Sequence, residues 1–336
     1  MLGVIFALLS AATFALNNAA ARRGVVTGSP IQGMAISIPM GVVCFLPVAV
    51  LTGEIGRLMQ FPATAAAWMA GVGLLHFILG RFCNYSASQA SGVNLTAPVI
   101  QLQVIVTLTL AVAILHEPCT ALQMIGGAMI FIGSIATQQQ PSRATRGTTK
   151  DAAVPADSGI GKPAAFVPRR IAGYVYASGA ALAYGASPIM ARHALGDTGP
   201  ITGILGGLIA YGAATLVVVV ALLSPAIRRN VAALKRENAP WFVGSGVFVA
   251  MAQGFFFSAV AVAPIMLVMP LLQMSLVFRL LLSAWLNPDH EVFGPLVYVG
   301  VATAIGGALM VSIDTDFILS TLGAPETLAR ILRWRV

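Results

Sequence analysis

The second half of the chain repeats the first half, and each copy is built from apolar helical segments. Residues 3–33 align with residues 173–203 without a gap, so that Arg22 falls on Arg192. Each copy contains five apolar segments, and an odd number makes the second copy enter a membrane from the opposite face. Inverted repeats of this kind are typical of secondary transporters. Further matched pairs are Pro30 with Pro200, Trp68 with Trp241, Pro98 with Pro270, Gln101 with Gln273, and Glu117 with Glu291.

The apolar segments are long enough to cross a bilayer, which takes about 20 residues per helix. The 336-residue chain is 58% hydrophobic and 9% charged, whereas soluble domains are about 25% charged. The runs are continuous rather than alternating, which disfavours a β-barrel. We therefore predict an all-α integral membrane protein with ten transmembrane helices, arranged as two inverted five-helix repeats. The expected spans are 2–21, 31–52, 67–90, 93–115, 119–138, 171–191, 200–223, 241–262, 265–286 and 292–313.

The sequence divides into two repeats, a linker and a tail. We expect the first five-helix repeat at 1–138 and the second at 171–313. Residues 139–170 are rich in Pro, Gly, Ser, Thr and charge, so they cannot bury enough apolar surface to fold and should form a flexible polar linker. The C-terminal tail at 314–336 places apolar side chains against arginines, which fits either a helix in the headgroup plane or a disordered segment. Tight reversals are expected at Ser91-Gly92 and at Ala263-Pro264.

The positive charges give a prediction of orientation. Twelve Lys and Arg residues lie in the connections on one face, including the linker, and five lie on the other face. Because Lys and Arg collect in cytoplasmic loops, this asymmetry places the linker in the cytoplasm and both termini outside.

Two arginines lie inside expected spans, and an ionisable group at membrane depth requires an explanation. Arg81 shares a helical face with three polar residues, and Arg279 lies nearer the end of its span. Either arginine can bind an anionic or carboxylate-bearing substrate, or it can snorkel to the interface or bond to neighbouring carbonyls. Both explanations stay open for Arg81, and snorkelling is favoured for Arg279. The three residues beside Arg81 are Asn84, Tyr85 and Ser88.

Other polar residues in the spans form a wider set of candidate substrate ligands. Each could instead make an interhelical hydrogen bond worth about 0.6–2 kcal/mol. Two prolines are predicted to kink their helices, since each leaves a backbone carbonyl one turn earlier without its donor. The candidate ligands are Asn17, Asn94, Gln101, Tyr184, Gln253 and Gln273, and the kink-forming residues are Pro98 and Pro270.

All eleven acidic residues lie in loops, in the tail or at span ends. Glu117 and Glu291 fall at helix starts, where a carboxylate can hold terminal amides, so we interpret both as structural. A multidrug-cation exporter would need a buried carboxylate, and a membrane-embedded enzyme would need clustered acids or a nucleophile beside a base. We find neither pattern, and we expect no cofactor, metal or nucleic acid.

Both copies carry the same ordered residues around their fourth and fifth spans. A Pro lies early in the fourth span, a Glu opens the fifth, and spaced glycines follow. These are Pro98, Glu117, Gly126-Gly127 and Gly133 in the first copy, and Pro270, Glu291, Gly300 and Gly306-Gly307 in the second. Each half thereby resembles the EamA unit of the drug/metabolite transporter superfamily. The resemblance implies a ten-helix carrier whose first, third, fourth, sixth, eighth and ninth helices line a central cavity, with both termini usually cytoplasmic.

Buried arginine without buried acid leads to our hypothesis of function. We expect a secondary-active carrier, an exporter, that moves small amino-acid-like, anionic or zwitterionic metabolites across the inner or plasma membrane by alternating access. A proton or another ion could drive it. A flippase for a lipid-linked intermediate and a multidrug exporter remain alternatives, and a membrane-embedded enzyme is less favoured.

Overall fold

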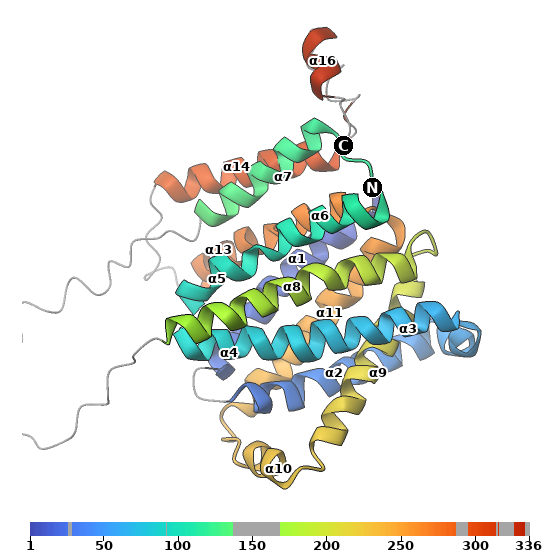
Figure 1. Ribbon diagram of the computed structural model, residues 1–336, viewed down its shortest axis with the longest axis vertical. Helices are drawn as coiled ribbons and strands as arrows, with labels where there is room; N and C mark the ends of the chain where they lie inside the picture. Colours follow the sequence, from blue (N-terminus) through green and yellow to red (C-terminus); the bar gives the residue numbers. More distant parts are fainter. Residues whose placement is uncertain are drawn as a thin grey trace, which may run out of the picture.

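The computed structural model describes residues 1–25, 29–91, 93–136, 169–286, 295–313, 315 and 326–332. Every regular element in these ranges is a helix (Figure 1). Glu291 and residues 139–168 of the expected linker lie outside the described residues.

The first half of the chain folds into a series of nearly parallel or antiparallel helices (Figure 1). Its third expected span is one long rod in which α-helix, π-helix and α-helix follow one another. The elements are α1 (Leu2–Val25), α2 (Pro30–Leu51), the 3-10 helix η1 (Glu54–Gln60), α3 (Ala63–Val72), the π-helix η2 (Gly73–Gly80), α4 (Arg81–Ser91), α5 (Val93–Gln101), α6 (Gln103–Leu115) and α7 (Ala121–Ala136).

The second half has the same order of long helices, with one short amphipathic helix, α10, on an outer edge (Figure 1). A short helix also forms within the expected C-terminal tail. The elements are α8 (Arg170–Leu195), α9 (Thr202–Ala221), α10 (Pro225–Ala232), α11 (Ala239–Val262), α12 (Ile265–Leu272), α13 (Met274–Leu286), α14 (Pro295–Ser312) and α16 (Glu326–Leu332).

Each expected span coincides with a helix or with consecutive helices. Within the described residues, five helical stretches have the length and apolarity to cross a membrane, and several shorter apolar helices accompany them. The chain is therefore an all-helical, multi-pass membrane protein. The reversal predicted at Ala263-Pro264 is confirmed, because α11 ends at Val262 and α12 begins at Ile265. The five stretches are Pro30–Leu51, Ala63–Ser91, Pro98–Leu115, Thr202–Ala221 and Ala239–Val262.

Small residues let the helices approach closely, which supplies the contact that the hydrophobic effect cannot supply in lipid. Ala7 and Ala11 of α1 are fully buried, and α1 packs along α11, where Ser10 Oγ donates to the carbonyl of Ala252 at 2.8 Å. On α8, a Cβ at Gly185 would lie 2.6 Å from Val106 of α6. Small residues at these positions thus form the contact surfaces between the helices.

The helices α7 and α14 form a pair at one edge of the bundle, where they pack against α12 and α13 (Figure 1). Their glycines meet backbone to backbone. A Cβ on Gly126 would lie 2.9 Å from the carbonyl oxygen of Gly307, and one on Gly133 would lie 2.5 Å from that of Gly300. A Cβ does not fit at these glycine positions without a shift, so the glycines fix the separation of the two helices.

We predict that Gly133→Ala lowers thermal stability. The methyl group would overlap the Gly300 carbonyl and force the helices apart, and overpacking of this kind costs about 1–3 kcal/mol. Gly212→Ala is the matched control, because nothing lies within 4 Å of a Cβ there, and Ala is the better helix former by about 1 kcal/mol. Melting of the detergent-purified variants measures both effects. An equal or higher melting temperature for Gly133→Ala would contradict the prediction.

Candidate functional site

The chain forms a polar and aromatic cluster around Arg81 inside the bundle. Arg81 is the first residue of α4 and follows directly on η2, and its N–H bonds to the carbonyls of His76 and Ile78. The bond to His76 spans five residues, the spacing of a π-helix. This change of register brings the five-residue neighbours His76 and Arg81 into one cluster. Such π segments within α-helices frequently lie at functional sites.

The guanidinium of Arg81 is buried, with 5% of the residue exposed. Its Nη1 donates to Oγ of Ser37 on α2 at 2.9 Å, and its Cζ lies 5.4 Å from the ring centroid of Phe77. No carboxylate forms an ion pair with Arg81 within the described part of the chain. The arginine therefore does not snorkel to the interface, and its charge is met by hydroxyl and aromatic groups. Three tyrosines interact with it: Tyr85, Tyr184 and Tyr211.

Tyr211 of α9 places a hydroxyl group beside Arg81 in a fully buried position. Its ring stacks on Phe77 with centroids 4.0 Å apart, and Gly41 of α2 leaves the space that the ring occupies. The hydroxyl makes no hydrogen bond of good geometry. A fully buried donor without an acceptor is costly, so this group has capacity for a further acceptor.

His76 of η2 links three helices. Its Nδ1 lies 2.7 Å from Ser187 Oγ on α8, and its Nε2 lies 2.9 Å from Gln253 Nε2 on α11. Its ring also lies 4.6 Å from the ring of Tyr184. With the amide oriented as it is, Nε2 accepts from Gln253 and Nδ1–H donates to Ser187. Ser187 is then not deprotonated by the imidazole, so this contact is not a nucleophile with its base.

Several cluster residues keep accessible surface although they lie within the bundle. His76, Asn84, Tyr85 and Tyr184 are each only half-buried, while helices surround the cluster on several sides. Asn84 also hydrogen-bonds to Tyr184. These four side chains therefore keep some surface that a solute could contact.

A second polar contact joins the two halves of the chain. Gln273 Nε2 donates to Gln101 Oε1 at 3.3 Å. Both glutamines lie beside helix interruptions: one at Leu102, between α5 and α6, and one at Gln273, between α12 and α13. Each interruption follows a proline within about one turn, Pro98 in α5 and Pro270 in α12.

The remaining predicted residues lie elsewhere. Asn17 of α1 is half-buried and accepts a hydrogen bond from Ser245 of α11 at 2.7 Å. Ser88 is half-buried on α4, and Arg279 is half-buried on α13, outside the groups that interact with Arg81. The side chain of Asn94 lies outside the described residues. The structure thus brings Arg81, Asn84, Tyr85, Tyr184 and Gln253 into one region, and the other described candidates make none of the contacts given for Arg81.

Sequence reasoning missed Ser37 and Tyr211. They lie on α2 and α9, the second and seventh long helices, which the resemblance did not assign to the cavity. The available signal was the few hydroxyl-bearing residues within these strongly apolar spans, which are Ser37 in α2 and Thr202, Tyr211 and Thr215 in α9. Their contacts with Arg81 add these two helices to the site.

Glu117 forms a network at one end of the bundle. Its Oε2 accepts from the N–H of Met266 in the first turn of α12 at 3.0 Å, and its Oε1 accepts from Nε of Arg192 at 3.3 Å. Arg192 also donates to the carbonyl of Val260 at 2.8 Å and to Asp197 at 3.3 Å. Glu117 holds a helix N-terminus, as a structural carboxylate should, but that helix belongs to the other half of the chain.

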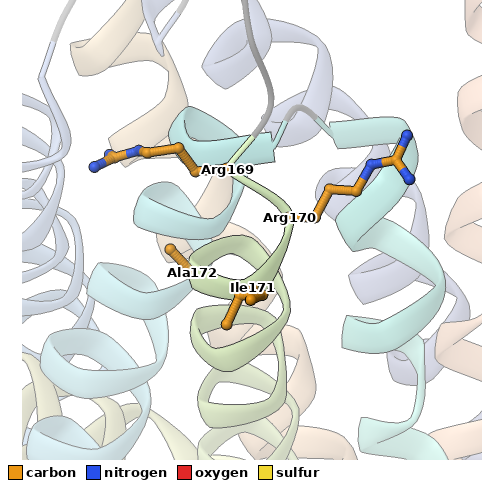
Figure 2. Close-up of a pocket in the computed structure, with 4 residues that line it drawn as sticks. All are labelled: Arg169, Arg170, Ile171 and Ala172. Atoms are coloured by element: carbon orange, nitrogen blue, oxygen red, sulfur yellow. The ribbon is translucent and has the colours of Figure 1, made fainter.

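A wide pocket of about 640 Å³ opens at the start of α8, lined by Arg169, Arg170, Ile171 and Ala172. Figure 2 shows that the two arginine side chains point away from each other, so they do not form a clamp for one anion. The Arg81 cluster is the better candidate site.

We predict that Glu117→Gln destabilises the protein more than Glu54→Gln. Both changes remove a charge from an ion pair, but Arg192 is 14% exposed at its side chain and Arg57 is 71% exposed. Hydrogen bonds to charged groups contribute about 1.5–3 kcal/mol, whereas exposed ion pairs contribute about 0–1 kcal/mol. Thermal unfolding of the two purified variants tests the ranking. Equal losses would show that the Glu117 network does not hold the helix ends together.

Comparison with known proteins gives a family match for the first repeat and a similar fold for nearly the whole chain. The family described as the EamA-like transporter family matches residues 1–137. Fifteen chains of known structure match as well. One, described as "Crystal structure of protein", shares 15% sequence identity and a TM-score of 0.68, over 96% of this chain and 98% of its own. No curated protein matches the sequence.

Proposed function

We propose that this chain, whose residues 1–137 match the EamA-like transporter family, is a secondary-active carrier for small anionic or zwitterionic metabolites, including amino-acid-like compounds. The observation that carries the proposal is a buried Arg81 without a carboxylate partner among the described residues. Transport proceeds by alternating access between two inverted five-helix repeats, residues 1–138 and 171–313, at the cell membrane.

Reciprocal packing supports two inverted repeats of ten spans. Two copies related by a two-fold axis make their contacts in matched pairs. If helix A of the first copy contacts helix B of the second copy, then helix B of the first copy contacts helix A of the second copy. Here α1 packs along α11, and its equivalent α8 packs along the rod of α3, η2 and α4. The equivalent helices α2 and α9 contact each other, as do α7 and α14.

Individual residues follow the same rule. The alignment that pairs Glu117 with Glu291 also pairs Gly126 with Gly300 and Gly133 with Gly307. Gly126 contacts Gly307 while Gly133 contacts Gly300, which is the reciprocal pattern of an isologous contact. Gln101 and its equivalent Gln273 hydrogen-bond to each other. A residue that touches its own equivalent lies on the pseudo-two-fold axis, in the middle of the bundle.

The chemistry of the Arg81 cluster favours a carboxylate ligand. A guanidinium presents several donors in one plane, which matches the two oxygens of a carboxylate. Arg81 uses Nη1 on Ser37, and the Tyr211 hydroxyl beside Arg81 has no acceptor for its own proton. A carboxylate between these groups would satisfy both and neutralise a buried charge. The half-buried rings of Tyr85 and Tyr184 would contact the apolar part of the solute.

The same cluster argues against a multidrug-cation exporter. Such a carrier needs an acidic group to attract the positive substrate, and Arg81 would repel it. Among the described acidic residues, Glu54 is the first residue of η1, Glu117 precedes α7, Asp197 follows α8, Glu237 lies between α10 and α11, and Glu326 opens α16. None of them interacts with Arg81.

We predict that Arg81→Gln lowers carboxylate transport by at least tenfold. Loss of a hydrogen bond to a charged group costs about 1.5–3 kcal/mol, and each 1.4 kcal/mol is about tenfold. Purified protein in liposomes, offered labelled amino acids, organic acids and nucleobases, gives the measurement. Arg279→Gln is the matched control and should retain transport, because Arg279 lies outside the cluster. If Arg81→Gln leaves transport of every active solute unchanged, the anion site is elsewhere. Activity toward lipid-linked sugars alone would favour a flippase.

We also predict that the linker is cytoplasmic. The connections on the same face of the bundle as the linker, including the linker itself, carry twelve Lys and Arg residues, against five on the other face. Lys and Arg collect on the cytoplasmic side of a membrane protein. A cysteine introduced between residues 145 and 160 should react with an impermeant thiol reagent only in inverted vesicles. The native cysteines Cys44, Cys83 and Cys119 are replaced first. Labelling in intact cells would place both termini in the cytoplasm instead.

A further inference from the structure

We infer that His76 is a proton-binding site of the carrier, and that a proton at His76 and a carboxylate at Arg81 bind cooperatively. The inference rests on the proposed function and names the coupled ion. It is carried by the hydrogen-bond partners of the imidazole and by the charges around it.

The two partners of His76 can serve both protonation states of the ring. In the neutral ring, Nε2 accepts from the Gln253 amide and Nδ1–H donates to Ser187. In the charged ring both nitrogens donate, Ser187 still accepts, and Gln253 needs only to turn its amide so that Oε1 faces the ring. Ser187 Oγ in turn lies 3.4 Å from the carbonyl of Tyr184, to which it can donate in either state. The site therefore takes up a proton without losing a hydrogen bond.

The charges around His76 make that proton depend on an anion. The charged or titratable neighbours in the cluster are Arg81 and Tyr85 on the same rod, Tyr184 on α8 and Tyr211 on α9, and α11 contributes the neutral Gln253. No described carboxylate faces the ring. A charged imidazole would be a second positive group beside a buried arginine, and a bound carboxylate would offset both charges.

Cooperative binding fixes the direction of coupling. Because linkage is reciprocal, a carboxylate that favours the proton is favoured by the proton to the same extent. The loaded carrier then moves both in the same direction, as a neutral pair for a monocarboxylate. An inward proton gradient therefore drives uptake, and export takes place when the outward gradient of the metabolite is the larger one. A zwitterion brings its own positive charge and should couple more weakly.

The test follows the His76 ring directly. Protein labelled with ¹⁵N-histidine is reconstituted in nanodiscs and titrated with pH, alone and with 3-phenylpropionate or acetate as probes, and with phenylalanine as the zwitterionic match of the first. The chain contains four histidines, and His76→Gln identifies the resonance. We expect either carboxylate to raise the midpoint of the His76 titration by about 0.7–2 pH units, equal to about 5- to 150-fold coupling, and phenylalanine to raise it less.

Proteoliposomes supply the second measurement. An inward proton gradient should accelerate uptake of the probe by the wild type. His76→Gln should bind the probe with the affinity of the unprotonated wild type at every pH and lose this acceleration. His193→Gln is the matched control, because His193 is exposed and packs edge-on against Trp68, away from the cluster. Two results would overturn this inference alone. One is Arg81-dependent binding of a probe without a shift of the His76 midpoint, and the other is gradient-driven uptake by His76→Gln. Absence of any Arg81-dependent binding overturns the proposed function and this inference with it.

Discussion

Close approach of helix backbones is the constraint on which the structure depends. Lipid tails are as apolar as the helix surfaces, so helices are held together by packing and by hydrogen bonds rather than by the hydrophobic effect. Glycines provide the closest contacts: Gly73 on the π segment lies against the Ala210 backbone of α9, and Gly41 on α2 lies against the Tyr211 ring. These contacts bring three helices around Arg81 and leave aromatic rings, rather than aliphatic side chains, beside its guanidinium.

Hydrophobicity and repeats predicted the position of the helices, because the length and apolarity of a segment are local properties. The helices α11 and α12, for example, follow from a run too long for one crossing and from Ala263-Pro264 within it. Local properties do not determine register. The π segment at Gly73–Gly80 changes which residues face the interior, and no pattern in the sequence marked it. The contacts of Arg81 with Ser37 and Tyr211 likewise depend on how distant helices pack.

Glu117 is a second example of a contact between distant segments that the sequence did not predict. Its place at a helix start indicated that it would bind backbone amides, and it does bind one. The amide belongs to Met266, however, on a helix of the opposite half. A carboxylate at the start of one helix can instead bind the N-terminus of a different helix, if the fold places that N-terminus nearer to it. A single sequence does not reveal which of the two N-termini is nearer. The result is a network in which Arg192, Val260 and Met266 of the second half all connect to one loop of the first.

The hydrogen bond between Gln101 and Gln273 has a consequence for any solute that crosses the bundle. In the proposed inverted repeat, two amides that are each other's repeat equivalents would stand at equal depth from both membrane surfaces. A solute reaching them from either side would meet the same pair of amide groups, so these two residues alone would not distinguish one side of the membrane from the other. The sidedness of the carrier must then come from residues that the two halves do not share, and Arg81 is one of these, since the matching rod of the second half, α11, contains no charged residue.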